Sequence, residues 1–524
     1  MPDRTSRPFR RSRRPTRVCY SARLRHKRAH RLPAALSTEY MDRNMNAPYC
    51  GHDASARSDR SRSSGRSRAR PALFARNADF KAGRRLIATG GYFAVLAVFG
   101  GGLAGWTPGY ILVSAAIVVA VLALAWRDGF HALDDTPPLA KIALIGIAVL
   151  PLLQLIPLPP GAWQALPGQA LRHQVLTLAG LGNSWQPMSV EPVGTAISAL
   201  LTIGFTVLVA MLMRLSDRDF RSVLLLAFAL VLFGILIGMV QVVTDGQFPN
   251  PHGIVMGPTL QGFYANKNHM AVILAVTILL AGFVVVPRFF VSQRRLWINL
   301  GYIAFALVCI VSTNSRAGLA LGGVATLIVL HDQTRKIDWR YKIAGLAVLV
   351  LLAGLILSTA AFELVSGRFE DVDSDLRWRI ATWSWPLAER YWALGSGAGS
   401  FATLFAANEQ LAWVKPTFVN HAHNEYLQLV IEFGMTGFVV LAVLLASLVR
   451  PLLLWWRQPR TARDHALMTF GFAGILLLAL HSAVDYPLRR PAGWAFLALA
   501  LVAVYRGYRT AMVGGAPAQR EETA

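Results

Sequence analysis

Long apolar runs separated by short polar segments make up most of the chain from about residue 87 onward. Most of these runs approach the roughly 17–25 residues that an α-helix needs to cross the hydrocarbon core of a bilayer. We expect membrane spans at 87–104, 108–126, 140–157, 194–213, 221–241, 269–286, 296–312, 317–331, 343–361, 434–449, 467–483 and 492–508. The pattern predicts an all-α polytopic membrane protein with about twelve transmembrane helices, so both termini lie on one side.

The connections between these runs differ in charge, and this difference predicts their side of the membrane. Lys and Arg are in excess in "MRLSDRDFR", "PRFFVSQRR", "HDQTRKIDWRYK" and "RPLLLWWRQPRTARD", so the positive-inside rule places these connections in the cytoplasm. The remaining connection of this set, "WRDGFHALDD", is acidic and gives no support of its own. The alternate connections then face outward, which in a bacterium is the periplasm. We therefore expect a multi-pass protein of the bacterial inner (cytoplasmic) membrane, with both termini cytoplasmic.

One outward connection, 362–433, is far longer than the others. It contains Trp378, Trp383, Trp385, Trp392 and Trp413. Amphipathic aromatic side chains are stable at the boundary between membrane and water. We expect a large periplasmic loop that carries short helices lying on the outer boundary of the membrane.

The composition agrees with a membrane protein and sets apart an N-terminal segment. The chain is 54% hydrophobic and 15% charged, whereas a soluble domain is about 25% charged. Residues 1–85 carry a net charge of +17 out of a total of +24 and have almost no apolar clusters, which predicts a disordered tail. This tail either contacts RNA or anionic lipid, or is a solvated cytoplasmic extension or upstream sequence, with Met41 or Met45 as the true first residue. The predicted organisation is this tail, a transmembrane domain at 86–508 and a cytoplasmic tail at 509–524.

Residues suited to chemistry gather on the outward-facing segments. They are Asn266, Lys267, Asn268, Arg316, Arg377, Arg379, His421, His423, Asn424, Glu432, Asp485, Arg489 and Arg490. Ionisable groups at membrane depth are costly, so they usually have a partner or a function. Cations outside the membrane also run against the positive-inside tendency. An anionic ligand on that side would explain both observations.

Two residue types in this group suit a phosphate-bearing substrate. Arg316 and Arg379 would suit a pyrophosphate, because each guanidinium binds oxygens bidentately and stays charged at physiological pH. A histidine, with an ordinary pKa near 6.5, suits proton removal from a hydroxyl group. Structural alternatives stay open, because an arginine near a helix end, such as Arg489, often extends toward the lipid headgroups and a loop histidine is often structural.

Other motifs do not fit a known site. "EDVDSD" resembles an acidic calcium loop, but Leu376 stands where the loop needs Gly and Thr382 where it needs Glu. The three cysteines, Cys19, Cys50 and Cys309, show no zinc-type spacing. The chain has no P-loop, HExxH or GxSxG motif. We therefore expect no metal, no cofactor and no nucleic-acid partner.

Four motifs together resemble those of the O-antigen ligase and polymerase family. "HAHNEYLQLVIEFGMTGF" contains a His-Asn pair, a Leu three residues after that Asn, and a Glu-x-Gly-x-x-Gly that opens a span. "SRAG", "RIATW" followed by "LGSGAGSF", and "VDYPLRRP" before the last span are similar to the family's other motifs, in the same order. The resemblance covers 86–508, and the basic tail departs from it, which favours a later start.

The resemblance implies a metal-independent, inverting glycosyltransferase of the membrane GT-C type. Such an enzyme takes a glycan from undecaprenyl diphosphate and passes it to an acceptor hydroxyl at the periplasmic face. It implies that His423 is the general base and that Arg316 and Arg379 hold the diphosphate, with Lys267 and Asn268 as weaker candidates for the same pocket. The other candidates for substrate binding are His421, which is also the weaker candidate for the base, Asn424, Glu432, Asp485 and Arg489.

Several alternatives stay open. The acceptor is lipid A-core for a ligase, another lipid-linked glycan for a polymerase, or a protein hydroxyl for an O-oligosaccharyltransferase; only sixteen residues follow Tyr508, which disfavours the last. The alternative class is a membrane transporter or flippase of lipid-linked glycan, which predicts repeat-related halves and a binding site near the midplane. The sequence does not determine ligase against polymerase, the sugar or the oligomeric state.

Overall fold

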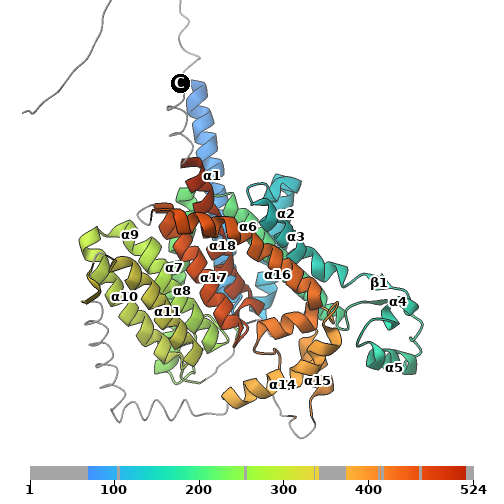
Figure 1. Cartoon of the computed structure of the whole chain (residues 1–524). Helices are drawn as coiled ribbons and strands as arrows, with labels where there is room; N and C mark the ends of the chain where they lie inside the picture. Colours follow the sequence, from blue (N-terminus) through green and yellow to red (C-terminus); the bar gives the residue numbers. More distant parts are fainter. Residues whose placement is uncertain are drawn as a thin grey trace, which may run out of the picture. The chain divides into compact units, whose positions relative to one another are not determined.

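The computed structural model describes residues 69–102, 107–252, 257–335, 337–340, 373–410, 414, 418–459 and 463–514. This part of the chain is predominantly helical (Figure 1). The α-helices are α1 (Ala69–Phe99), α2 (Pro108–Asp128), α3 (Pro138–Leu153), α4 (Pro160–Gln164), α5 (Ala170–Leu178), α6 (Pro192–Met213), α7 (Asp217–Val243), α8 (Lys267–Leu280), α9 (Val286–Phe289), α10 (Ser292–Ser312), α11 (Arg316–Gln333), α14 (Asp373–Tyr391), α15 (Phe401–Asn408), α16 (Glu425–Arg457), α17 (Arg463–Ser482) and α18 (Pro491–Gly514).

Short irregular elements complete the described chain. The 3₁₀ helix η1 (Gly129–Leu133) follows α2, and the 3₁₀ helix η4 (Pro487–Arg489) precedes α18. The π-helical turn η2 (Ala281–Val285) joins α8 to α9. Two-residue strands β1 (Pro157–Leu158) and β2 (Gln186–Pro187) pair antiparallel and close the excursion that holds α4 and α5.

Eleven of the twelve predicted spans coincide with helices, and the remaining one, 343–361, lies outside the described residues. In the described part, seven helices are long and apolar enough to cross a membrane: α2, α6, α7, the continuous helix Lys267–Phe289, α10, α16 and α17. α3 is apolar but has 16 residues. The membrane-protein class is thus supported, whereas the count of twelve spans stays a prediction.

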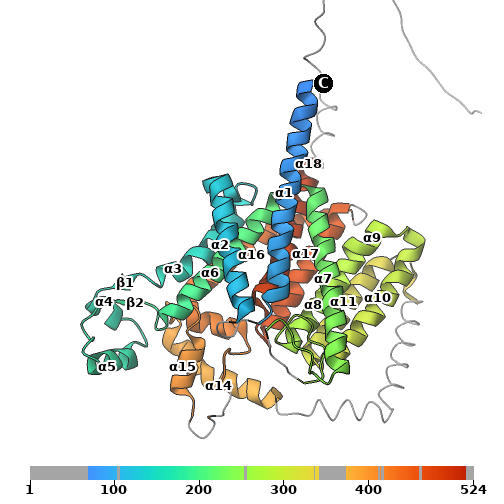
Figure 2. The ribbon, with the colours of Figure 1, turned by 180° about the vertical axis from the view of Figure 1, so that it is seen from behind.

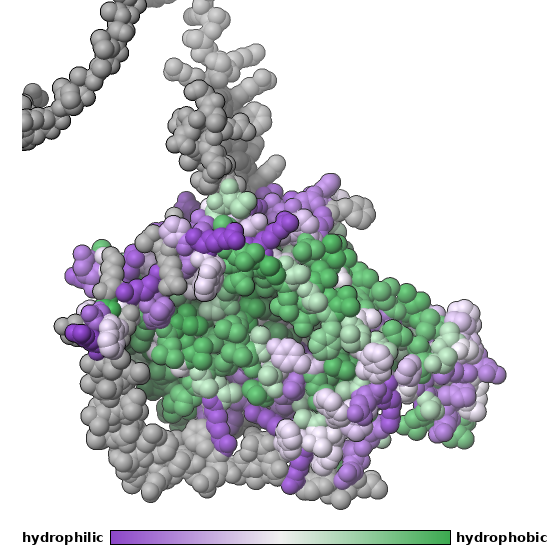
Figure 3. Space-filling view, viewed as in Figure 1, coloured by the Kyte–Doolittle hydropathy of each residue, from purple (hydrophilic) through white to green (hydrophobic). Residues whose placement is uncertain are grey.

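The surface has the polarity that a membrane-embedded bundle requires. In Figure 3, hydrophobic residues form a band across this face of the described bundle, with hydrophilic residues gathered above and below it. On α2, residues such as Val119 and Leu122 are each 64% exposed. Large apolar side chains directed outward along a helix are stable when lipid surrounds them.

α8 is the most enclosed of the long apolar helices. Its continuous helix Lys267–Phe289 is 83% buried over its most apolar window, whereas that of α2 is 22% buried. A helix that is apolar on every side is stable only when other helices cover it, and here α10, α11 and α17 pack against it. Gly318 of α11 lies against Ala271, because a β-carbon added at Gly318 would come within 2.3 Å of the Ala271 side chain. The first turns of α8 and α11 are therefore close together.

The predicted loop 362–433 contains helices α14 and α15 in its described part, 373–410, and Trp413 lies outside the described residues. These helices form a second apolar core with the start of α16, which includes Ile380, Leu387, Phe401 and Ile431. Short helices in this segment were expected. Their placement at the outer membrane boundary stays a prediction. Figure 2 shows from behind that α14 and α15 lie beyond the same ends of the long helices as the α4–α5 excursion.

The N-terminal region is covered only in part. Residues 1–68 lie outside the description, and with them Cys19, Cys50, Met41, Met45 and the proposed RNA or lipid contacts. α1 begins at Ala69, so its first turns overlap the segment predicted as a tail.

Candidate functional site

The carboxylate of Asp485 is the centre of the polar cluster. Asp485 is fully buried in the connection between α17 and α18. Its Oδ2 accepts a hydrogen bond of 2.7 Å from Asn268 Nδ2 and lies 3.5 Å from a guanidinium nitrogen of Arg377. Its Oδ1 accepts from Asn266 Nδ2 at 3.4 Å and lies 3.5 Å from His423 Nδ1. Four separate segments of the chain thus meet at one carboxylate.

Asp485 remains ionised in this environment. Burial by itself raises the pKa of a carboxyl group, but the neighbouring imidazoles of His269 and His423 outweigh burial and hold the pKa of Asp485 well below its ordinary value. A buried carboxylate with this many donors is a fixed negative charge that orients the groups around it.

His423 is held in position by the start of α16. Asn424 caps this helix, because its side-chain oxygen accepts 3.0 Å hydrogen bonds from the backbone N–H groups of Tyr426 and Leu427. His423 itself has a φ of +51°, a left-handed conformation that is uncommon outside glycine. This bend directs Nδ1 toward Asp485, while the side chain keeps 23% of its exposure. Nδ1 therefore faces the carboxylate, and Nε2 is the nitrogen suited to meet a substrate.

Tyr486 separates three histidines. Its ring centroid lies 4.2 Å from that of His421 and 5.0 Å from those of His423 and His269. Burial raises the pKa of Tyr486, so the phenol is neutral. The aromatic ring fixes the spacing of the imidazoles.

His421 is enclosed by protein groups. Its Nε2 lies 3.2 Å from an Arg490 guanidinium nitrogen and its Nδ1 lies 3.3 Å from Gln428 Nε2. Burial and the charge of Arg490 lower the pKa of His421 well below its ordinary value. This environment is more typical of a structural histidine than of one that contacts a substrate.

Glu432 and Arg489 form a buried ion pair beside a kink of α16. A guanidinium nitrogen of Arg489 contacts Glu432 Oε2, and Gln428 donates to Glu432 Oε1 at 2.8 Å. The kink is at Gly434, which has a φ of +58° and a ψ of −148° inside the helix. The structure therefore gives Glu432 and Arg489 a protein partner, and their predicted role in substrate binding stays a prediction.

The kink accounts for the glycine-rich motif "LGSGAGSF". The carbonyls of Ile431 and Glu432, which a regular helix would pair internally, accept hydrogen bonds from the N–H groups of Ser396 at 2.8 Å and Gly397 at 3.1 Å. A β-carbon at Gly395 would come within 2.3 Å of the Glu432 carbonyl oxygen. The glycines thus let the turn after α14 approach the backbone of α16.

The remaining predicted cations lie at helix N-termini or on α14. Lys267 and Arg316 are the first residues of α8 and α11, whose first turns pack together. Arg316 is exposed, and Arg379 is half-buried on α14. Among the described ion pairs, the residue of α14 that contacts Asp485 is Arg377. Residues two positions apart on an α-helix point about 200° apart, so Arg377 and Arg379 face different directions.

Sequence reasoning missed three members of the cluster. His269 and Tyr486 were not singled out, and Arg377 was named among the outward-facing cations without a place in the site. His269 follows directly after the "NKN" of α8, and Tyr486 follows Asp485, so adjacency to predicted residues was an available signal. In the described residues, no group of three or more His, Cys, Asp or Glu side chains is arranged to hold a metal ion.

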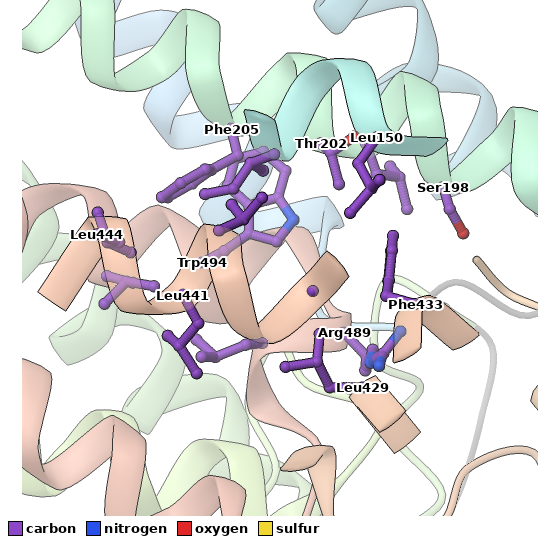
Figure 4. A pocket seen from close by; sticks show the side chains of 16 residues that line it. Leu150, Ser198, Thr202, Phe205, Leu429, Phe433, Leu441, Leu444, Arg489 and Trp494 are labelled. Carbon is purple, nitrogen blue, oxygen red and sulfur yellow. The ribbon is translucent and has the colours of Figure 1, made fainter. Parts of the chain in front are cut away.

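An apolar pocket opens beside Arg489. Its volume is about 280 Å³, and it lies between α3, α6, α16 and α18 (Figure 4). Its walls include Leu150, Phe205, Leu441 and Trp494, and Arg489 lies at one end. A hydrophobic cavity with a polar ion pair at its end suits an amphipathic molecule.

The comparison with known families agrees with the motifs. The family model described as O-antigen ligase matches residues 301–442. Residues 301–442 are thus similar to the O-antigen ligase family. This confirms the family resemblance that the sequence motifs predicted, and the match includes Arg316, Arg379, His423 and Glu432. No curated protein matches the chain.

The family match and the apolar helices support a multi-pass membrane protein with glycosyltransferase activity of the O-antigen ligase type, a family that takes part in polysaccharide biosynthesis. Lys267, Asn268 and Asp485 lie outside the matched residues. Asn268 and Asp485 contact each other, whereas the role of Lys267 stays a prediction.

Proposed function

We propose that this protein transfers a glycan from undecaprenyl diphosphate to an acceptor hydroxyl at the periplasmic face of the inner membrane, as a ligase or a polysaccharide polymerase. The observation that carries the proposal is the contact between His423 Nδ1 and the buried carboxylate of Asp485, at 3.5 Å. An imidazole whose Nδ1–H faces a carboxylate presents the Nε2 lone pair, which is the arrangement of a general base.

In the proposed reaction, His423 Nε2 takes the proton of the acceptor hydroxyl as its oxygen attacks the anomeric carbon. The new glycosidic bond forms on the face opposite the diphosphate, the bond to the diphosphate oxygen breaks, and the configuration inverts. Negative charge develops on the departing diphosphate. Cations already positioned near that charge stabilise it and lower the barrier, because no solvent has to reorient during the reaction.

Arg316, Arg379 and Lys267 are the residues we assign to the diphosphate. Lys267 and Arg316 begin α8 and α11, so their positive side chains coincide with the positive ends of two helix dipoles. Helix N-termini favour anions for this reason. The close packing of these first turns supports a common anion site.

The apolar pocket beside Arg489 suits the lipid part of the donor. It is lined by α6 and α16, both of which are long and apolar enough to span a membrane. An isoprenoid chain that enters this pocket would stay in an apolar environment while the diphosphate reaches the polar cluster.

The proposal is tested by transfer with the purified full chain in lipid nanodiscs, using undecaprenyl-diphosphate glycan and candidate acceptors. We expect His423→Ala to lower kcat by about 10²–10⁴-fold, because the general base is lost. His131→Ala is the matched control, since His131 is exposed and pairs with Asp134 in η1. Full transfer by the His423 variant would exclude it as the base. Movement of intact lipid-linked glycan across the membrane without transfer would instead support a flippase.

The nature of the product separates the remaining acceptors. Transfer to lipid A-core indicates a ligase, lengthening of a lipid-linked glycan indicates a polymerase, and modification of a protein hydroxyl indicates an O-oligosaccharyltransferase.

A further inference from the structure

A second pocket lies on the other flank of the α16 N-terminus, and the residues discussed above do not account for it. It has a volume of about 630 Å³ and lies between α14 and the start of α16. The residues that line it are Trp385, Ala388, Glu389, Trp392, Asn424, Tyr426, Leu427, Val430 and Phe438. Asn424, which directly follows His423 in the chain, is one of these lining residues.

The α14 side of the groove has a regular pattern. Four of these residues follow the helical spacing i, i+3, i+4 and i+7: Trp385, Ala388, Glu389 and Trp392. This spacing places them along one face of α14, with Trp392 directly after its last residue, Tyr391. The indoles of Trp385 and Trp392 are 60% and 58% exposed. Seven residues of helix correspond to about 10 Å, which is close to the length of a disaccharide.

Glu389 lies between the two tryptophans and fixes one of them. Trp385 Nε1 donates a 2.8 Å hydrogen bond to Glu389 Oε1. The carboxylate therefore orients the indole and keeps its second oxygen as an acceptor. On the opposite wall, the side-chain oxygen of Asn424 is used as the helix cap, which leaves its amide nitrogen to donate.

We propose that this groove binds sugar rings of a glycan acceptor and presents a hydroxyl of the acceptor to His423. A pyranose has an apolar C–H face, which packs on an indole, and hydroxyl groups at its edge, which pair with a carboxylate and an amide. The negative charge of Glu389 disfavours the diphosphate of the donor. A hydrocarbon chain could not pair with the second carboxylate oxygen of Glu389 or with the amide nitrogen of Asn424. This assignment rests on the proposed function, because only a glycosyltransferase has a glycan acceptor.

The helix beneath the groove is rigid enough to act as a platform. Leu387 and Ala388 of α14 are buried in the core that α14 shares with Leu427 and Ile431 of α16. Exposed tryptophans over a packed core lose little entropy when a ligand stacks on them. A membrane-boundary role is the competing explanation of exposed indoles, and α14 provides an internal control for it.

Trp378 is that control. It lies seven residues before Trp385 on α14, its side chain is 74% exposed, and it does not line the groove. A membrane anchor would depend on Trp378 as much as on Trp385 or Trp392. A sugar-binding groove would depend only on the latter two.

The kinetic test uses the full chain in nanodiscs. We expect Trp385→Ala and Trp392→Ala each to raise the acceptor KM by about tenfold, with the donor KM changed less than twofold. Glu389→Gln, which keeps the shape of the side chain, should raise the acceptor KM by a smaller factor. Trp378→Ala should leave both KM values unchanged, and Trp385→Phe should recover part of the affinity because it restores an aromatic face. Equal effects at Trp378 and Trp385, or a change confined to the donor KM, would overturn the assignment.

A binding test separates this inference from the proposed reaction. The probe is a soluble oligosaccharide released by mild acid from the cell's own surface glycan, titrated against tryptophan fluorescence of the wild-type protein. We expect saturable binding that Trp385→Ala and Trp392→Ala weaken and that Trp378→Ala retains, whether or not transfer occurs. Binding that is equally strong in all three variants would overturn the glycan groove even if the protein proved to be a transferase.

Discussion

At the scale of single residues, the sequence singled out several of the residues that lie together at Asp485, but not their contacts. His423, Asn268 and Asp485 are up to 217 positions apart and converge on one carboxylate. The motifs identified them because ionisable groups beside membrane helices are costly and therefore informative. The contact of Arg377 with Asp485 depends on the rotational setting of α14 about its axis. That setting is fixed by packing of Ile380 and Leu387 into a core formed with α16, which the local sequence does not specify.

Asp485→Asn tests whether this carboxylate positions the base. Asparagine keeps the volume but replaces one acceptor oxygen by a donor, so it no longer holds His423 by charge. We expect kcat to fall by on the order of 10²-fold or more, toward the effect of removing the base, with both KM values within about threefold of wild type. Kinetics with varied donor and acceptor measure this separation, and purified protein of normal yield and helicity excludes a folding failure.

Asp485→Glu is the conservative comparison, because it retains the charge with a longer side chain. Partial recovery of kcat by this glutamate variant, relative to the asparagine variant, would agree with an electrostatic role. If the asparagine variant raised both KM values and left kcat intact, Asp485 would be a binding residue and the positioning role would be wrong.

At the scale of helices, apolar runs predicted where helices exist more accurately than where they begin. The predicted span 434–449 corresponds to α16, which begins at Glu425 and ends at Arg457. An apolar window detects only the part suited to lipid, whereas the helix starts at the Asn424 cap and includes a polar turn. The Gly434 kink could not be predicted from periodicity, because it depends on hydrogen bonds from residues 396 and 397.

Gly434→Ala tests the importance of the kink. An alanine β-carbon at this position would lie 2.7 Å from backbone atoms of Ala393, Leu394 and Gly395, and the positive φ is unfavourable for any residue with a side chain. We expect a loss of at least about 1–3 kcal/mol in the free energy of unfolding, and a loss of transfer activity, because the turn after α14 no longer docks on α16. Thermal unfolding in detergent and the transfer assay measure the two effects.

Gly323→Ala is the matched control for that change. Gly323 lies inside α11, and a β-carbon there meets nothing within 4 Å. Alanine should leave stability unchanged or raise it by up to about 1 kcal/mol. If both glycine variants behaved alike, the special role of the kink would be refuted.

At the scale of the described bundle, α18 connects two buried polar clusters. Near its start, Arg490 contacts His421 beside the Asp485 cluster. Near its end, the buried Arg506 donates to the carbonyls of Met213 and Leu215 and contacts Asp217. Arg506 lies sixteen positions after Arg490, which corresponds to about 24 Å of helix, and residues 498–505 between them are all buried. This spacing is somewhat shorter than the roughly 30 Å hydrocarbon core of a bilayer, so we expect the Asp485 cluster to lie near one of its faces.

The side of the membrane on which that face lies is the last prediction. The α4–α5 excursion belongs to the same face as the site, because Tyr391 at the end of α14 donates to the Gly168 carbonyl at 2.9 Å and Val190 donates to the Ser396 carbonyl.

Leu178 of α5 is 90% exposed, and Val291, between α9 and α10, is 62% exposed in a connection expected to be cytoplasmic. Cysteines at these two positions, with Cys19 and Cys50 replaced by Ser and the buried Cys309 retained, report on opposite faces. We expect a membrane-impermeant maleimide to label Leu178→Cys in cells with a permeabilised outer membrane, and Val291→Cys only after the inner membrane is broken. The reverse pattern would place the His423 site in the cytoplasm, where a periplasmic acceptor could not reach it, and would thereby exclude the proposed reaction.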